Sequence, residues 1–194
     1  MVNSTFKTAI RLFDEANSND PNIEIWNDRE YPKELLYAKR MTDKLDQFEP
    51  NASEVLQLAV RCQHICRWKI PRDSYEMNRI GYLTWRRDLG KFHAKKASEI
   101  LKEVGYSDNV IDNVKFLLQK KQLKKNEETQ LLEDVICLVF LEFYFEIFSE
   151  KYSEEKIINI IQKTWVKMSD KGHEFALKLN FSENSLQLIQ KALD

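Results

Sequence analysis

Apolar residues recur along this chain every three to four positions, the spacing that places side chains on one face of an α-helix. Phe6, Ile10 and Phe13 form the first such face. A second helix is expected to begin near Pro32, after the turn NSNDPN, because proline suits the first turn of a helix. A third is expected over residues 53 to about 68, where Ile70-Pro71 ends the helical pattern.

The pattern resumes after an irregular stretch that we take as a loop at residues 69–83. The helices predicted beyond it are 84–104, with Gly105 as its stop, a helix around 110–118, a very apolar one over about 130–150, and an amphipathic one around 157–168, followed by one or two short helices. We therefore expect a single all-α domain over residues 1–194, a bundle of about seven to nine helices with a functional loop at 69–83.

Composition agrees with an all-helical fold. The chain has only four Gly and four Pro in 194 residues, which is few for a protein built from many turns. This length buries a core without help from a metal or a disulfide. The chain has three Cys, an odd number, and Cys62 and Cys66 lie one helical turn apart on a shared face, so we expect free thiols rather than a bridge or a Cys-His metal site.

Two features predict a soluble, cytoplasmic protein that does not bind membranes. The first residues, MVNSTFKTAI, lack the basic and apolar segments of a signal peptide. The most apolar stretch, 135–148, is shorter than the roughly 20 residues of a membrane-spanning helix and contains Glu142 and Glu146. It is expected to be a buried core helix.

Charge is balanced overall and uneven along the chain. Residues 61–125 contain 16 Lys and Arg against 7 Asp and Glu, whereas the remainder contains 14 against 24. A basic middle attracts phosphate and other anions, although a solvated helical face gives the same count. The count alone does not choose between these interpretations.

The segment RCQHICRW is the first candidate for chemistry, because no Gly-rich phosphate loop, zinc-finger spacing or Ser-His-Asp signature is present. On one continuous helix, Arg61, His64 and Trp68 would share a stripe, with Arg67 at its edge. His93 is the second candidate, two helical turns after Arg86. Each histidine alone is as readily explained as a core residue that donates one ring N–H.

Glu142 and Asp134 are the carboxylates that we expect to face these groups. Glu142 is flanked by Leu141 and Phe143, which predicts partial burial, and a buried carboxylate needs a cation, a metal or a proton. A structural ion pair with Arg61 or Arg86 satisfies the same requirement. The predicted catalytic candidates are His64, His93 and Glu142, and the predicted metal ligands are His64, His93, Asp134 and Glu142, for zinc, manganese or iron.

An anion clamp is the other chemistry that these residues suggest. Several arginines lie close to aromatic residues that can stack on a ring or base. The predicted ligand-binding residues are Arg61, Arg67, Trp68, Arg72, Tyr75, Arg79, Tyr82, Trp85 and Arg86.

Histidines on consecutive helices, followed by an acidic and apolar helix, resemble the histidine-aspartate metal phosphohydrolase superfamily. If His64 matches the family histidine, Ile65 replaces the aspartate that bridges metals in that superfamily. The resemblance implies a helical phosphohydrolase-like scaffold with a degenerate dyad, which argues against ordinary two-metal chemistry.

A second resemblance covers most of the chain. The segments KELLYAKRMTDKL, RCQHICRWKIPRDSY, GYLTWRRDLGKFHAKKASEIL, LEDVICLVFLEFYF and KTWVKMSDKGHEFAL are similar to an uncharacterised family of bacterial and fungal helical proteins, sometimes labelled glutamyl-tRNA synthetase. KMSDKG is similar to one synthetase motif, but the parallel sheet and the partner motif of that enzyme class are absent from the pattern. The resemblance implies that residues 61–93 form the working surface.

Three functions fit these observations. The first is an enzyme or sensor that binds, and hydrolyses or otherwise processes, a small phosphorylated or carboxylated metabolite or nucleotide in an Arg/His/aromatic pocket. The second is an RNA- or tRNA-binding module, against which the net charge of −1 argues. The third is a catalytically inactive phosphohydrolase-like protein that acts through protein contacts. Convergent arginines favour the first function, and arginines spread along a surface favour the second.

Overall fold

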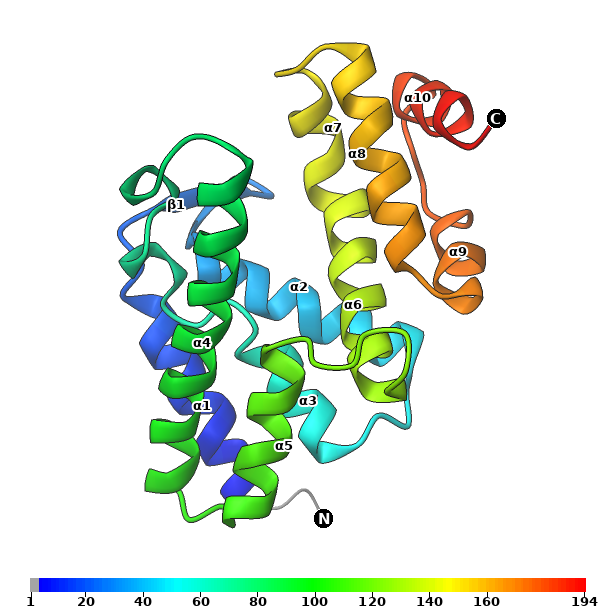
Figure 1. Cartoon of the computed structure of the whole chain (residues 1–194). Coiled ribbons are helices and arrows are strands. Elements are labelled where there is room, and N and C mark those ends of the chain that lie inside the picture. The colour runs from blue at the N-terminus through cyan, green and yellow to red at the C-terminus, as the bar shows by residue number, and fades with distance from the viewer. Residues whose placement is uncertain (1–3) are drawn as a thin grey trace. The chain divides into compact units, whose positions relative to one another are not determined.

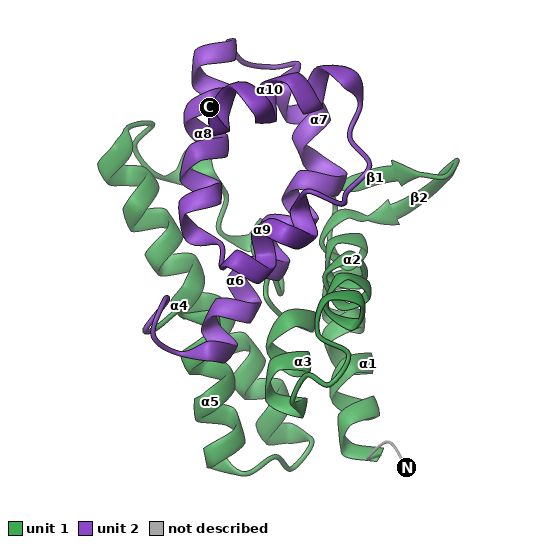
Figure 2. Ribbon diagram, turned by 90° about the vertical axis from the view of Figure 1, so that its right-hand side faces the viewer, with its two compact units in different colours: residues 1–121 green, residues 122–194 purple. Residues whose placement is uncertain are grey.

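A computed structural model describes residues 4–194, and the chain divides into two compact units that meet in sequence between Lys121 and Gln122 (Figure 2). Ten α-helices form most of the described part, with one small two-stranded sheet. The all-α fold class is thereby confirmed. No helix among residues 4–194 has the length and apolar character needed to cross a membrane.

Unit 1 contains five of the helices and the sheet. Its elements are α1 (Ser4–Ser18), β1 (Ile23–Trp26), β2 (Arg29–Pro32), α2 (Lys33–Phe48), α3 (Glu54–Arg61), two short 3₁₀ helices η1 (Arg67–Lys69) and η2 (Arg72–Ser74), α4 (Arg79–Glu103) and α5 (Asp108–Leu118) (Figure 1). α4 packs along α5, and α3 packs against both α2 and α5. Phe13, Met41, Leu45 and Leu58 are fully buried between them.

The third helix is shorter than expected. α3 ends at Arg61, and the chain continues in turns up to Cys66, which has a left-handed backbone with φ of 53°. That conformation interrupts a helix, and it is held because the Cys66 N–H donates to Asn17 Oδ1 at 2.9 Å. Arg61, His64 and Trp68 therefore do not share a helical stripe, and the predicted geometry of RCQHICRW is wrong.

A β-hairpin that the sequence pattern did not predict lies between the expected turn NSNDPN and α2. β1 and β2 pair antiparallel, from Ile23 opposite Pro32 to Trp26 opposite Arg29. The two residues between the strands, Asn27 and Asp28, both have positive φ, the backbone of a tight two-residue hairpin turn. The sequence signal was present in the alternating apolar residues before Asn-Asp, but four-residue strands are too short to stand out from a turn.

The long fourth helix begins earlier than predicted and ends where predicted. α4 starts at Arg79 because the Asn78 side chain caps it, accepting from the Gly81 N–H at 2.8 Å. Residues 79–83 of the expected loop at 69–83 are thus helical. The C-terminal stop is confirmed: Gly105 follows α4 with φ of +88°, a conformation that glycine adopts without strain.

Unit 2 consists of helices only. Its elements are α6 (Glu127–Val139), a π-helical turn η3 (Phe140–Tyr144), α7 (Phe145–Ser149), α8 (Glu154–Lys167), α9 (Asp170–Ala176) and α10 (Glu183–Leu193) (Figure 1). The predicted apolar helix at 130–150 corresponds to α6, η3 and α7 in continuous succession. α10 packs against α8, and Leu132, Leu138, Phe145 and Ile161 are fully buried.

The segment KMSDKG has a structural explanation in unit 2. Ser169 caps α9, accepting from the Gly172 N–H, and both its backbone N–H and its hydroxyl donate to the carboxylate of Asp134 on α6, at 2.8 and 2.6 Å. Asp134 is fully buried and also accepts from Gln130. Its carboxylate therefore joins α6 to the start of α9, and the similarity to a synthetase motif has no counterpart in this geometry.

The Asp134 junction predicts a specific intolerance at Gly172. A Cβ atom there would lie 2.7 Å from Asp134 Oδ1, closer than side chains pack. We expect Gly172→Ala to lower the free energy of unfolding by about 2 kcal/mol in urea titrations, because the overpacking outweighs alanine's helix propensity. Gly90→Ala in α4 is the control, since its Cβ has no neighbour nearer than 3.5 Å and should be neutral or stabilising. Equal losses in both variants would contradict this account.

Candidate functional site

Four polar side chains from separate elements of unit 1 meet inside it. They are Glu34 in the first turn of α2, His64 in the turn after α3, Arg67 in η1 and His93 in the middle of α4. We call these four residues the His64 cluster. The structure thus brings both predicted histidines together, with ring centroids 5.9 Å apart, and adds a carboxylate that sequence reasoning did not select.

The contacts of His64 determine which ring nitrogen carries the proton. Arg67 Nη1 lies 2.6 Å from Nε2, and because a guanidinium only donates, Nε2 must accept. The proton of the neutral ring is then on Nδ1, which faces Glu34 Oε2 at 3.2 Å. Tyr37 stacks on the imidazole with ring centroids 4.1 Å apart. The ring is therefore held in one orientation and one tautomer.

His93 is fixed from the opposite side of the cluster. Its Nδ1 lies 2.9 Å from the carbonyl oxygen of Ile65, and because a carbonyl only accepts, Nδ1 carries the proton. Its Nε2 is then a lone pair, which is buried and has no hydrogen-bond partner among the described residues. Burial and the neighbouring His64 lower the pKa of His93 to about 3, so the ring is neutral at physiological pH.

Positive charge surrounds His64. Burial lowers the pKa of His64 well below 6.5, and the charges of Arg67, Lys120, Arg86 and Lys33 lower it further. These cations come from η1, from the residues after α5, from α4 and from the start of α2. Cations from four separate segments therefore keep one half-buried imidazole neutral.

Glu34 is the acidic member of the cluster. Burial raises its pKa above the ordinary value, while Arg67, Lys33 and His93 act in the opposite direction. Arg67 Nε lies 3.9 Å from Glu34 Oε1, a longer approach than its contact with His64. The signal for Glu34 in the sequence was its position on the same helical stripe as Met41 and Leu45, which places a carboxylate on the buried face.

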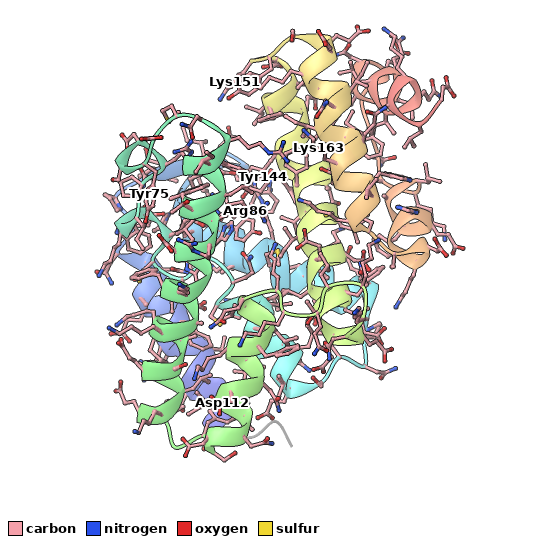
Figure 3. The ribbon with its side chains drawn as sticks, viewed as in Figure 1. Tyr75, Arg86, Asp112, Tyr144, Lys151 and Lys163 are labelled. Atoms are coloured by element: carbon pink, nitrogen blue, oxygen red, sulfur yellow. The ribbon has the colours of Figure 1, made fainter. Side chains whose placement is uncertain are left out.

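The predicted arginine and aromatic residues converge in part. Arg67 lies over the Trp85 ring at 5.0 Å, and Arg86 lies over the Tyr82 ring at 5.8 Å. Figure 3 shows Arg86 on α4 and Tyr75 in the segment before it. Arg86 is half-buried and has no hydrogen-bond or ion-pair partner within residues 4–194. Its guanidinium is thus available to an anion.

Other predicted arginines are occupied by the fold. Arg61 pairs with Asp14 through two bonds of 2.7 and 2.6 Å and also donates to Thr42. Arg72 donates to the carbonyls of Tyr75 and Glu76, closing the loop before α4. The N–H groups of these two guanidiniums therefore already donate to the protein and are not available to a ligand.

Among the remaining predicted ligand residues, Trp85 contacts the cluster through Arg67, whereas Trp68, Arg79 and Tyr75 have no hydrogen bond, ion pair or ring contact with its four members among the described residues. Trp68 is half-buried in η1, and Arg79 is exposed at the start of α4. The Tyr75 hydroxyl approaches Asp88 Oδ2 at 3.4 Å. Trp85 is buried and donates from its indole to the Ile70 carbonyl, so its role includes holding the loop.

The predicted metal ligands are not gathered into a site. Asp134 and Glu142 belong to unit 2, where Asp134 is bonded to Ser169, and Glu142 is exposed on η3 rather than partly buried as expected. The π turn directs Leu141 inward and leaves Glu142 at the surface. Across residues 4–194, no group of three or more His, Cys, Asp or Glu side chains is arranged to hold a metal ion. The residues present do not fit the metal that the phosphohydrolase resemblance implies.

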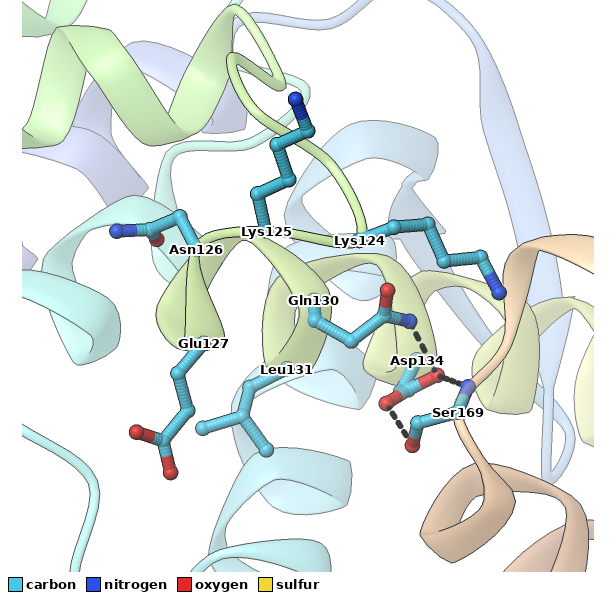
Figure 4. A pocket seen from close by; sticks show the side chains of 8 residues that line it. All are labelled: Lys124, Lys125, Asn126, Glu127, Gln130, Leu131, Asp134 and Ser169. Atoms are coloured by element: carbon cyan, nitrogen blue, oxygen red, sulfur yellow. Dashed lines mark hydrogen bonds between the residues drawn. The ribbon is translucent and has the colours of Figure 1, made fainter.

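Two surface hollows are lined by residues other than the four members of the cluster. One of about 300 Å³ is at the start of α6 (Figure 4), where Lys124 donates to the Met168 carbonyl and Gln130 to Asp134. Its polar groups mainly brace α6 against α9. The other is a shallow hollow on α4 lined by lysines and Glu99, four of its five lining residues being on that helix. Neither contains the histidines, so the chemistry of the His64 cluster is the stronger guide to function.

The ion pair of Arg61 with Asp14 predicts that Arg61 contributes more to stability than Arg86 does. The Arg61→Met variant leaves the Asp14 carboxylate without its partner, so we expect it to lose about 3 kcal/mol in the free energy of unfolding. Arg86→Met should change that free energy by less than about 0.5 kcal/mol. Urea titrations at pH 7.5 test both variants. A loss in Arg86→Met as large as that in Arg61→Met would show that Arg86 has a structural partner.

The buried neutral histidines predict acid sensitivity. Both rings have pKa values below the unfolded value of 6.5, so below that pH the unfolded chain binds more protons than the folded one. The free energy of unfolding should therefore fall as pH drops from 6.5 toward 3, by up to about 1.4 kcal/mol per pH unit for each histidine. Glu34, whose pKa is raised, offsets part of this loss between its folded pKa and 4.5.

The variant that isolates His93 is His93→Asn, whose amide keeps a donor for the Ile65 carbonyl and cannot titrate. Urea titrations between pH 7.5 and 5.5 should give a flatter dependence for this variant than for the wild type. An unchanged slope would mean that His93 is already protonated, or that another group dominates the acid sensitivity.

Comparison with known proteins places the chain in a family. No curated protein and no solved structure matches it. Residues 7–189 match the family described as Domain of unknown function (DUF4202), a span that includes nearly all of both units. This agrees with the resemblance to an uncharacterised helical family inferred from the sequence segments. The chain belongs to the DUF4202 family.

Proposed function

We propose that unit 1 binds a small phosphorylated or carboxylated metabolite at the His64 cluster. The observation that carries the proposal is the contact of Arg67 with the half-buried His64, where Nη1 lies 2.6 Å from Nε2. The charges of Lys33, Arg86 and Lys120 also lower the pKa of that imidazole. Like charges brought together at a partly buried site repel one another, and a bound anion relieves that repulsion. Arg67 and Arg86 are the principal clamp, because a guanidinium can present paired donors to a phosphate or carboxylate.

The cluster also supplies a group for processing the bound metabolite. The Nε2 lone pair of His64 is available once Arg67 turns toward an anion, and Glu34 beside Nδ1 stabilises the ring when it takes a proton. A bound anion offsets the cations that lower the pKa of His64 and therefore raises it toward neutrality. His64 is thus proposed as the proton acceptor in hydrolysis or a related reaction.

The alternative of RNA binding needs arginines spread along a surface. Arg61 is committed to Asp14 and Arg72 to backbone carbonyls. Arg67 contacts His64, and the charge of Arg86 lowers the pKa of the same ring. This convergence supports a compact anion over a polynucleotide backbone. A purely structural network is the third possibility. Such a network requires every cation to have a partner, and Arg86 has no acidic partner in the described part of unit 1.

Inorganic phosphate is the probe for the first test. Phosphate is titrated into the whole chain, and NMR spectra are recorded. We expect the chemical shifts of unit 1 residues around His64 to change and to saturate. Arg67→Met and Arg86→Met should each weaken phosphate binding about tenfold or more, because each removes a charge-assisted contact.

The matched control is Arg87→Met, the next residue on α4, whose exposed guanidinium pairs with Asp88. It carries the same change in net charge and should leave phosphate affinity within about twofold. Absence of saturable binding in the wild type, or an equal loss in Arg87→Met and Arg86→Met, would overturn the proposal.

A further inference from the structure

The buried Nε2 atom of His93 points to a second requirement on the ligand. His93 is only 4% exposed, its Nδ1 is committed to the Ile65 carbonyl, and Nε2 has no partner in the described structure. A buried acceptor without a donor costs free energy, so such an atom needs an explanation. Its position beside His64 places it at the proposed anion site.

The neighbouring groups do not provide the missing donor. The proton of His64 faces Glu34, and its Nε2 is itself an acceptor. Arg67 donates to His64, and no described side chain donates to His93 Nε2. Two imidazole acceptors therefore lie at one site. Nε2 of His64 accepts a hydrogen bond from Arg67, and Nε2 of His93 accepts none from the described residues.

A ligand that matches this site carries both an anion and a hydrogen-bond donor. We propose that it is a phosphate ester with a free hydroxyl group, such as a sugar or polyol phosphate, whose hydroxyl donates to His93 Nε2. This inference rests on the proposed function. The phosphate engages Arg67 and Arg86, and four cations around one site suit a dianion better than a single carboxylate.

Arg67 controls access in this arrangement. Its side chain is 31% exposed, against 19% for His64, and His93 is 4% exposed, so Arg67 is the most exposed of the three residues. When its guanidinium turns toward the phosphate, it leaves His64 Nε2 and opens the approach to the second ring. The ligand's hydroxyl then reaches His93 Nε2 from the side of His64.

The experiment compares two three-carbon phosphates that differ in their hydroxyls. Glycerol 3-phosphate and propyl phosphate are titrated into the full chain at pH 8, where both phosphates are dianions and only the first has hydroxyl donors. We expect glycerol 3-phosphate to bind about tenfold more tightly than propyl phosphate, because its hydroxyl makes one additional hydrogen bond to a buried acceptor. In His93→Asn, which lacks Nε2 and keeps the Ile65 contact, the ratio should fall to about one.

A measurement without a variant accompanies the titration. In protein labelled with ¹⁵N-histidine, the Nε2 resonance of His93 should move with glycerol 3-phosphate and stay nearly unchanged with propyl phosphate. This readout remains decisive if His93→Asn does not fold. His93→Gln, which can place an amide oxygen near the former Nε2, should keep more of the preference than His93→Asn.

The outcomes separate the two proposals. Equal binding of both phosphates by the wild type, as expected if a buried water satisfies Nε2, overturns the hydroxyl inference and leaves phosphate binding intact. A preference that persists in His93→Asn, or an Nε2 resonance that does not move, overturns the assignment to His93. Failure of both phosphates and of inorganic phosphate to bind overturns the proposed function itself.

Discussion

The side-chain amide of Asn17 is the interaction on which the candidate site depends. Asn17 is 1% exposed near the end of α1, where its Nδ2 donates to the Glu34 carbonyl and its Oδ1 accepts from the Cys66 N–H. Asp20 completes the arrangement by accepting from the Glu34 N–H. One short segment thus fixes both the start of α2, which carries Glu34, and the turn that carries His64. An apolar residue at position 17 could satisfy neither backbone group.

Hydrogen bonding explains how positive charge is tolerated around a histidine. A protonated His64 could not accept from Arg67, so the contact between Nη1 and Nε2 exists only while the imidazole is neutral. Arg67 in its present position and a charged His64 therefore exclude each other. A ligand that draws Arg67 away removes a barrier to protonation and, through its own negative charge, favours protonation. Binding and proton uptake are coupled through one guanidinium.

Local signals account for the parts of this structure that were predictable. The apolar spacing gave most helices, and Gly105 marked the end of α4. The serines at positions 53, 169 and 182 cap the helices that follow them. The block 61–93 was selected because histidines, arginines and aromatics are dense there, and it contains three of the four members of the His64 cluster. Each of these features depends on residues a few positions apart, where sequence patterns are informative.

Distant contacts account for what was missed. α3 ends at Arg61 because Asn17, far away in the sequence, holds Cys66 in a left-handed conformation, and no local breaker marks that end. The choice of carboxylate failed for a related reason. Apolar immediate neighbours pointed to Glu142, which is exposed, whereas Glu34 follows a lysine and resembles an ordinary first-turn glutamate. On a helix the residues three and four positions away decide burial, so the helical stripe that includes Met41 was the better guide.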